Sequence, residues 1–360
     1  MAGLGLNPAF CQGKSVLVTG HTGFKGGWLS LWLQELGARA TGFSLPDFTQ
    51  PNLFEYADVG KSMKSHYGDL RDPEEVRNRL NEFRPEIIFH LAAQSLVREG
   101  FVDPLGTYAT NVMGTANLLD AVRHTNSVRV VIIVTSDKCY ENKAWPWGYR
   151  EIDSLGGKDP YSSSKSCAEI VTAAYRHSFF GKDSGVSVAS VRAGNVIGGG
   201  DWAKDRLIPD VFRSFEKNEP VILRYPQAVR PWQHVLEPLR GYLMLAEQLW
   251  RHGEDFTEAW NFGPNPEDAK PVAWLADQLA ALWKHGARWD ISQDKHPEES
   301  VLLSLDSSKA GQRLGWRPKW RLEKSLVETY NWHRAWSDGL NMHDYTLAQI
   351  QAYARSLHDD

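Results

Sequence analysis

The chain has 360 residues, of which 42% are hydrophobic and 23% charged, with a formal net charge of -4. This composition excludes a collagen, a coiled coil and a disordered tail, and it predicts one large or two modest globular domains. Because there is no long basic run and no apolar run of about 18 residues, we expect a small-molecule partner, no nucleic acid and no membrane span. The three cysteines fit neither a disulfide framework nor a zinc site, and residues 1–13 lack the features of a secretory signal, so we expect a cytoplasmic protein.

Short β-rich segments alternate with helical segments in the first half of the chain. The expected strands are residues 15–20, 39–43, 86–91, 130–135 and 186–192, and the expected helices are residues 24–36, 73–83, 105–124 and 160–180. The strands are apolar enough to be buried on both faces, as in a parallel sheet, and the helices are long enough for right-handed crossovers. Asp72 precedes Pro73 as an N-cap, and Glu75 is placed to close a capping box. The sequence predicts an α/β fold with a doubly wound parallel sheet of the Rossmann type.

Beyond about residue 195 the chain has more irregular segments with Gly, Pro and Trp, which predicts a smaller substrate-binding lobe. We expect a cofactor-binding domain over residues 1–194, with returning segments at about 232–264 and 300–306. Residues 195–231 and 265–360 would form the smaller lobe, ending in a polar tail from Gly339 that is either a terminal helix or partly disordered.

The first expected strand leads into a glycine-rich turn and then into an apolar helix. Glycines allow a tight turn and let backbone N–H groups approach a pyrophosphate at the positive end of that helix. Since the turn opens the first βαβ unit, we predict a dinucleotide site there rather than mere close packing of the helix. The turn residues expected to contact the cofactor are Gly20, Thr22, Gly23, Phe24, Lys25 and Gly26.

Ser44 stands where an acidic residue usually binds the adenosine ribose. Its hydroxyl can bond a ribose but cannot repel a 2′-phosphate, so it does not separate NAD from NADP; because no arginine stands beside it, we favour NAD. Asp69, followed by Leu70, comes after the third strand and is expected near the adenine, or else as a solvated residue at the end of a loop.

Tyr161 and Lys165 place a phenol and an ammonium group on one face of a helix. The spacing alone is common, but Tyr161 follows the strand that ends at Thr135, so both lie at the carboxyl edge of the sheet, where α/β folds bind ligands. A nearby lysine cation and an oxidised nicotinamide both favour the phenolate. We therefore expect the pKa of Tyr161 to lie below its usual value of about 10 and Tyr161 to act as a base toward a hydroxyl group.

The sequence resembles the extended short-chain dehydrogenase/reductases that act on nucleotide sugars. The resemblance covers nearly the whole chain and rests on the glycine turn, on Tyr161 with Lys165, and on His90-Leu-Ala-Ala-Gln94, Asn111-Val-Met-Gly-Thr115 and Arg192-Ala-Gly-Asn195. Thr135-Ser-Asp-Lys-Cys-Tyr140 is similar to the active-site strand of the 4,6-dehydratases, with Lys138 in place of a glutamate. That departure, with Gly199-Gly-Asp-Trp202 and Arg230-Pro-Trp-Gln-His234, resembles the CDP-glucose 4,6-dehydratases.

The resemblance implies a lyase that removes water from CDP-glucose by an internal hydride cycle on NAD, in making deoxyhexoses for bacterial surface polysaccharide. Tyr161 would take the 4-hydroxyl proton beside Lys165, and Asp137 would protonate the departing 6-hydroxyl from a carboxyl with a raised pKa. Lys138 would take the C5 proton, which requires a neutral amine with a lowered pKa, or else would stabilise the enolate as a cation. Ser136 would share the 4-hydroxyl proton, or else only cap the end of the strand.

The same resemblance implies the binding residues. Gln94, Ser136 and Asn195 would contact the hexose and pyrophosphate. Arg192 and Arg230 are natural diphosphate clamps, although Arg192 is equally well placed as a buried ion-pair partner. Further cofactor contacts fall at Leu91, Ala92, Ala93 and Thr110, and His234 is a substrate-side packing or ribose-contact residue. No cluster of His and Cys has metal-ligand spacing, so we expect no metal.

Three alternatives stay open from the sequence: a dehydratase for dTDP-, GDP- or UDP-linked sugars, a 4-epimerase of the same family, and a non-catalytic NAD-binding regulator. Asp137 and Lys138 argue against a simple epimerase, which needs no acid–base pair for C5 and C6. In relatives, the helices that correspond to residues 105–124 and 160–180 pair between subunits, so the resemblance implies a homodimer or homotetramer.

Overall fold

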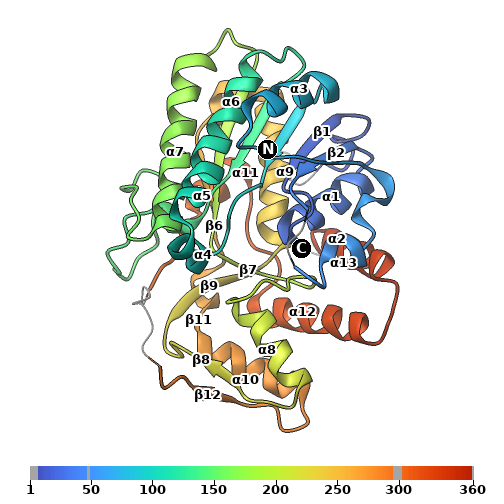
Figure 1. Ribbon diagram of the computed structural model, residues 1–360, viewed down its shortest axis with the longest axis vertical. Helices are drawn as coiled ribbons and strands as arrows, with labels where there is room; N and C mark the ends of the chain where they lie inside the picture. The colour runs from blue at the N-terminus through green and yellow to red at the C-terminus, as the bar shows by residue number, and fades with distance from the viewer. Residues whose placement is uncertain (1–6, 47–48, 295–301, 359–360) are drawn as a thin grey trace.

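The computed structural model describes residues 7–46, 49–294 and 302–358. Its centre is a parallel seven-stranded sheet with the order β10-β6-β5-β4-β1-β2-β3 (Figure 1). These strands are β1 (Ser15–Thr19), β2 (Arg39–Ser44), β3 (Lys64–Tyr67), β4 (Ile87–His90), β5 (Val130–Val134), β6 (Ser187–Ala193) and β10 (Ala259–Phe262). The strand order reverses between β1 and β4, which is the switch point at which such sheets bind ligands. The predicted doubly wound fold is confirmed.

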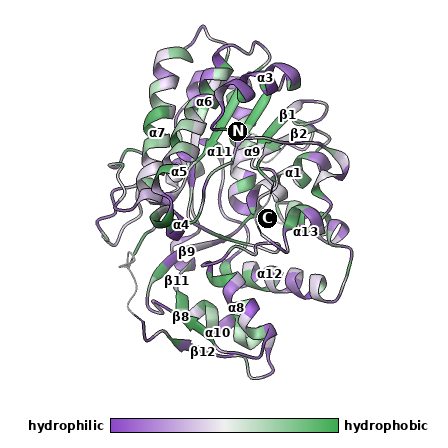
Figure 2. Cartoon of the chain, viewed as in Figure 1, coloured by the Kyte–Doolittle hydropathy of each residue, from purple (hydrophilic) through white to green (hydrophobic). Residues whose placement is uncertain are grey.

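Alternate residues of the central strands enter two separate hydrophobic cores, one on each face of the sheet. Val16 and Ile132 belong to the core shared with α1 (Phe24–Glu35) and α9 (Leu236–His252). Leu17 and Ile133 belong to the opposite core, with α3 (Pro73–Phe83) and α6 (Gly114–Arg123). Strands that are apolar on both faces must be covered twice, which explains the two helical layers. Figure 2 shows these central strands in the green of hydrophobic residues.

Both helix predictions around the second core were close, and each shows one local difference. Expected helix 105–124 consists of α5 (Pro104–Tyr108), a π-helical turn over Ala109–Met113, and α6. Asp72 caps α3 as predicted, accepting from the backbone N–H of Glu75. The predicted capping box is wrong, because the backbone N–H of Asp72 already donates to Asp69 O and the Glu75 carboxylate accepts from the backbone N–H of Asp69 at 3.0 Å.

A smaller part of the molecule is built from residues beyond β6 and has its own hydrophobic core. Its strands are β7 (Asn195–Ile197), β9 (Val229–His234) and β11 (Ala269–Pro271) in one sheet, and β8 (Val221–Leu223) with β12 (Trp289–Ile291) in another. Its helices are α8 (Leu207–Glu216), α10 (Val272–Trp283) and α12 (Leu322–Ser337), at the bottom of Figure 1. The remaining short helices are α2 (Leu53–Tyr56), η1 (Val59–Ser62), α4 (Val97–Val102), η3 (Asp137–Cys139), η4 (Gly253–Phe256) and η5 (Pro266–Asp268).

The chain crosses between the two parts repeatedly. After β9 it returns to the large sheet as α9 and β10, and it returns again as α11 (Ser308–Leu314) and α13 (Met342–Ser356). We expected the tail to belong to the smaller lobe, but α13 packs against α1, where Tyr353 contacts Trp32 and donates to Glu237 at 2.7 Å. The expected return at residues 300–306 is described only from residue 302, because residues 300 and 301 lie outside the described part. Within the described ranges, no helix is both long and apolar enough to cross a membrane.

Candidate active site

The glycine turn joins β1 to α1 at the carboxyl edge of the sheet. Gly20 has φ +76°, and a Cβ there would lie 2.7 Å from the backbone N of Ala92. A Cβ on Gly26 would lie 2.0 Å from Gly20 O, so only glycine fits where the helix meets the turn. Gly23, the N-cap of α1, offers no side-chain cap, which leaves the first N–H groups of the helix without a side-chain partner. The turn is therefore a cradle for an anionic group such as a pyrophosphate.

Two polar residues, one beside this turn and one within it, contact each other. Ser44 is buried, and its Oγ is 3.0 Å from Thr22 Oγ1 and 3.1 Å from His21 Nδ1, so its hydroxyl already has protein partners. His21 was not among the predicted site residues; its pKa is lowered to about 4 by burial and, secondarily, by His66. Its only sequence signal was its place inside the glycine turn.

The other expected cofactor residues border the same edge. Leu91, Ala92 and Ala93 follow β4, and the backbone N–H of Ala92 donates to Thr19 Oγ1 at 3.3 Å. Thr110 lies in the π-helical turn. Asp69 forms an ion pair with Arg71 at 2.5 Å, and that hydrogen bond lowers the pKa of the Asp69 carboxyl, while Leu70 is buried.

Tyr161 and Lys165 enter the site from the first turns of α7 (Pro160–Phe179). Both are nearly buried, and burial raises the pKa of Tyr161 to about 12, while a hydrogen bond with Ser136 and the charge of Arg206 act in the opposite direction. In the protein alone, desolvation thus outweighs the opposing interactions. The expected pKa below 10 includes the charge of an oxidised nicotinamide and stays a prediction. Burial lowers the pKa of Lys165 to about 8, and its Nζ lies 3.5 Å from Val134 O.

Ser136, Asp137 and Lys138 follow β5 directly and form the start of η3. The Ser136 Oγ donates to Asp137 Oδ1 at 2.9 Å and accepts from the backbone N–H of Lys138 at 3.2 Å, so it caps this turn as well as contacting Tyr161. Asp137 is 4% exposed, and burial raises the pKa of its carboxyl in the expected direction, against the charge of Lys138 and others. Its Oδ2 is buried without a hydrogen-bond partner among the described residues. This oxygen is free to meet a ligand hydroxyl.

Two further cations approach this group, and sequence reasoning assigned neither to it. Arg206, just before α8, pairs with Asp201 at 2.9 Å and donates to Ser95 Oγ at 3.1 Å. Burial lowers the pKa of Lys25 to about 8, as do the charges of Arg206 and Lys165, whereas Asp137 raises it. Lys25 was expected at the cofactor; its electrostatic neighbours also include the Asp137 carboxyl.

The expected substrate residues have different surroundings in the structure. Arg230 on β9 is buried, and its charge lowers the pKa of Asp137, so it belongs to the site. Asn195 begins β7 and is partly exposed. The Gln94 amide donates to Thr107 Oγ1 at 2.9 Å and its carbonyl accepts from the backbone N–H of Leu96, so its side chain is engaged in the loop after β4.

Two of the expected substrate residues are structural. Arg192 forms a buried ion pair with Glu169 at 2.9 Å, so the diphosphate-clamp interpretation is wrong and the ion-pair alternative is confirmed. His234 is fully buried, its ring centroid lies 5.9 Å from Trp28 and 5.0 Å from Trp320, and burial lowers its pKa to about 3. A neutral imidazole enclosed by two indoles is a packing group, so a substrate contact at His234 is wrong.

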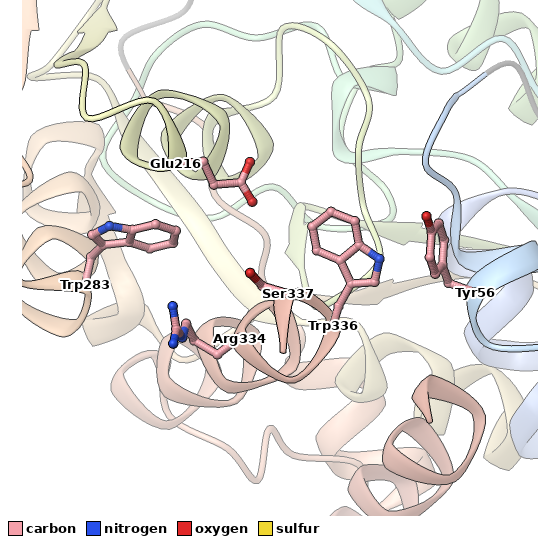
Figure 3. A pocket seen from close by; sticks show the side chains of 6 residues that line it. All are labelled: Tyr56, Glu216, Trp283, Arg334, Trp336 and Ser337. Atoms are coloured by element: carbon pink, nitrogen blue, oxygen red, sulfur yellow. The ribbon is translucent and has the colours of Figure 1, made fainter. Parts of the chain in front are cut away.

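A cavity of about 540 Å³ lies elsewhere, where α2 meets the smaller part of the molecule. Figure 3 shows Trp283 and Trp336 on opposite sides of it, and its walls are completed by Tyr56, Glu216, Arg334 and Ser337. None of the predicted site residues lines it. In the described part of the chain, no group of three or more His, Cys, Asp or Glu residues could hold a metal ion.

Comparison with known proteins relates this fold and site to nucleotide-sugar enzymes. The sequence model of the family described as GDP-mannose 4,6 dehydratase matches residues 17–329. The CDP-glucose 4,6-dehydratase of Salmonella typhimurium is 53% identical over 96% of this chain and 97% of its own length. Two solved structures share the fold: an epimerase from Methanothermobacter thermautotrophicus (TM-score 0.79, 22% identity, 92% of this chain and 95% of that one) and the dTDP-glucose 4,6-dehydratase of Bacillus anthracis in complex with NAD (TM-score 0.74, 22% identity, 90% and 98%).

Proposed function

The chain belongs to the nucleotide-sugar 4,6-dehydratase family of the extended short-chain dehydrogenase/reductases, and we propose that it converts CDP-glucose to CDP-4-keto-6-deoxyglucose and water. The observation that carries the proposal is Asp137, a buried carboxyl with a raised pKa and an unpartnered oxygen beside Ser136 and Tyr161. A protonated carboxyl at this position is the acid that a departing 6-hydroxyl needs. The choice of CDP-glucose is supported by the 53% identity with the Salmonella enzyme.

We further propose that NAD is the cofactor. The cradle around Gly20 and Gly26 and the uncapped start of α1 fit its pyrophosphate. His21 beside Ser44 has a pKa near 4 and is neutral at pH 7, so neither residue offers the positive charge that a 2′-phosphate prefers. Held by this cradle, NAD would supply the hydride chemistry that links C4 and C6 of the sugar.

The side chains of the site supply the proton transfers. As a phenolate, Tyr161 takes the proton of the sugar 4-hydroxyl, and Ser136 hydrogen-bonds the same oxygen. The resulting C4 ketone makes the C5 proton acidic, and Lys138, next to Asp137 in η3, is the candidate base for it. Asp137 gives its proton to the 6-hydroxyl, which leaves as water. Arg230 beside Asp137 is the candidate diphosphate clamp, because a guanidinium group matches two phosphate oxygens.

A direct test offers the protein four sugars separately: CDP-glucose, dTDP-glucose, UDP-glucose and GDP-mannose, each with and without added NAD. We expect mass spectrometry to show loss of one water from CDP-glucose alone. Loss of water from another sugar would change the proposed substrate but not the proposed reaction. Conversion of a sugar to an isomer without loss of water would support a 4-epimerase, and no conversion despite bound cofactor would refute the proposal.

Lys138→Ala is expected to abolish exchange of the C5 hydrogen with deuterated solvent, because it removes the amine that would take this proton. The exchange is measured by mass spectrometry of the recovered sugar. Lys143→Ala is the matched control, since Lys143 follows in the same loop, is 53% exposed and pairs only loosely with Glu141 at 3.5 Å. Undiminished exchange in Lys138→Ala would exclude Lys138 as the base and leave it the electrostatic role.

We also propose a homodimer that pairs the helices around α7. Exposed apolar side chains gather on α4, α5, the π-helical turn and α7. These residues, with their exposed fractions, are Phe101 (56%), Val102 (77%), Leu105 (80%), Met113 (54%), Ile170 (56%) and Phe179 (44%). Apolar surface of this kind is typical of a subunit contact. Light scattering of the purified protein measures the assembly, and a tetramer would require a second contact. A cytoplasmic location stays a prediction.

A further inference from the structure

A buried carboxylate lies one helical turn beyond Lys165, and the proton transfers above do not use it. Glu169 is on α7 and is 3% exposed. Its Oε1 accepts hydrogen bonds from Thr135 Oγ1 at 2.5 Å and from Arg192 Nε at 3.0 Å. Its Oε2 accepts from Ser190 Oγ at 2.6 Å and from Arg192 Nη2 at 2.9 Å. One carboxylate thus joins α7 to the end of β5, through Thr135, and to β6, through Ser190 and Arg192.

The pair with Arg192 keeps this carboxylate charged. Burial alone would raise the pKa of Glu169, but Arg192 and the hydroxyl donors hold it below its usual value. A buried ion pair adds little stability compared with well-packed neutral groups of the same size. Its more specific effect is geometric, because each of its hydrogen bonds fixes the position of one neighbouring segment.

Two of the three segments that Glu169 joins, α7 and the end of β5, carry catalytic groups. Thr135 directly precedes Ser136 and Asp137, so a hydrogen bond to its hydroxyl holds the base of the turn that presents them. On the helix side, Lys165 Nζ approaches Val134 O at 3.5 Å, and the charge of Glu169 opposes the lowering of the Lys165 pKa by burial. The end of β5 is therefore attached to α7 at two successive residues, once by Lys165 and once by Glu169.

We propose that Glu169 is a positioning residue for the dehydration: through Thr135 it holds the strand end bearing Ser136 and Asp137 against the helix bearing Tyr161 and Lys165. The inference rests on the proposed function, because it concerns the geometry of those catalytic groups. A displacement of about 1 Å between reacting groups can cost about 100-fold in rate. Loss of this attachment should thus slow the chemical step and leave nucleotide binding intact.

Thr135→Val tests the attachment while preserving the Glu169–Arg192 ion pair, so that no buried charge is left without its partner. We expect kcat to fall by about 10-fold and KM to change by less than about 2-fold. Ser190→Ala is the matched control, since it removes a hydroxyl donor to the same carboxylate from a strand that carries no catalytic group. It should leave kcat within about 2-fold of the wild type. Equal kcat values in the two variants would overturn the proposal.

Glu169→Gln should lower kcat further, by about 100-fold, but it also leaves a buried guanidinium unpaired and lowers the thermal midpoint. A second variant that combines Glu169→Gln with Arg192→Met removes both charges and should recover stability without recovering kcat. Recovery of kcat in this double variant would show that Glu169 acts only as the ion-pair partner of Arg192, and would contradict the proposal. All kcat and KM ratios between variant and wild type are measured on the nucleotide sugar that the wild type converts. A wrong assignment of the sugar would then show in the wild type alone, as failure to convert CDP-glucose. A crystal structure of Thr135→Val needs no substrate, and unmoved Ser136 and Asp137 would contradict the proposal independently.

Discussion

Tyr161→Phe is expected to lower kcat for CDP-glucose by at least about 100-fold, the usual contribution of a positioned acid–base group, with KM nearly unchanged. The substitution removes only the phenolic oxygen, which is proposed to take the 4-hydroxyl proton, and it keeps the buried aromatic ring at the start of α7. The rate is measured as loss of water under saturating CDP-glucose and NAD. Because the first proton transfer requires this oxygen, hydride uptake by the cofactor should fall in parallel.

The pH dependence gives a second check on Tyr161. Burial raises its pKa to about 12 in the protein alone, and the positive charges of Arg206 and of an oxidised nicotinamide favour the phenolate. The reactive form is deprotonated, so turnover by the wild type should rise with pH as the tyrosine ionises. Tyr175→Phe, on the same helix, is the control and should keep both the rate and this profile. Near-normal turnover in Tyr161→Phe would refute its assignment.

Asp137→Asn is expected to lower the rate of water loss by at least about 100-fold. Hydride uptake from C4 and exchange of the C5 hydrogen should continue. Asparagine keeps the size of the side chain but cannot deliver a proton to the departing hydroxyl. In the variant, absorbance of the reduced cofactor should accumulate without loss of water from the sugar. This separates an acid at the second step from a group needed for the first.

The sign of the pH effect on Asp137 is opposite to that on Tyr161. The pKa of the Asp137 carboxyl is raised by burial, and the form that acts is protonated, so elimination in the wild type should decline as pH rises through that pKa. Asp153→Asn, in the nearby loop where Asp153 pairs with Arg150, controls for loss of a carboxyl and should keep the wild-type profile. Unimpaired elimination in Asp137→Asn would assign the acid elsewhere.

Local patterns were sufficient to predict the main elements. Strands such as β5, apolar throughout, and helices such as α3, begun by Asp72 and Pro73, carry their own signals in consecutive residues. The π-helical turn over Ala109–Met113 leaves no comparable mark in the sequence. Its buried Asn111 hydrogen-bonds Gln94 and Ser164, which are distant in sequence.

The residues proposed for the site could be named from the sequence, but the neighbours with which they interact could not. Arg192 could serve a diphosphate or a carboxylate, and the choice depends on Glu169, which is distant in sequence and adjacent in space. His234 likewise has no short-range signal of its enclosure by Trp28 and Trp320. The raised pKa of Tyr161 in the protein alone could not be foreseen, because charges are visible in a sequence, whereas the extent of burial is a property of the fold.

The repeated crossings of the chain determine how this enzyme could change its substrate. A fragment that ends at residue 194 would lack β10, an edge strand of the central sheet, and α9, which covers one of its faces. The smaller part is therefore not an independent domain joined through a single linker, and exchanging it alone would require several separate junctions in the chain. A fragment that ends at residue 194 should therefore fail to fold, because it lacks both β10 and α9.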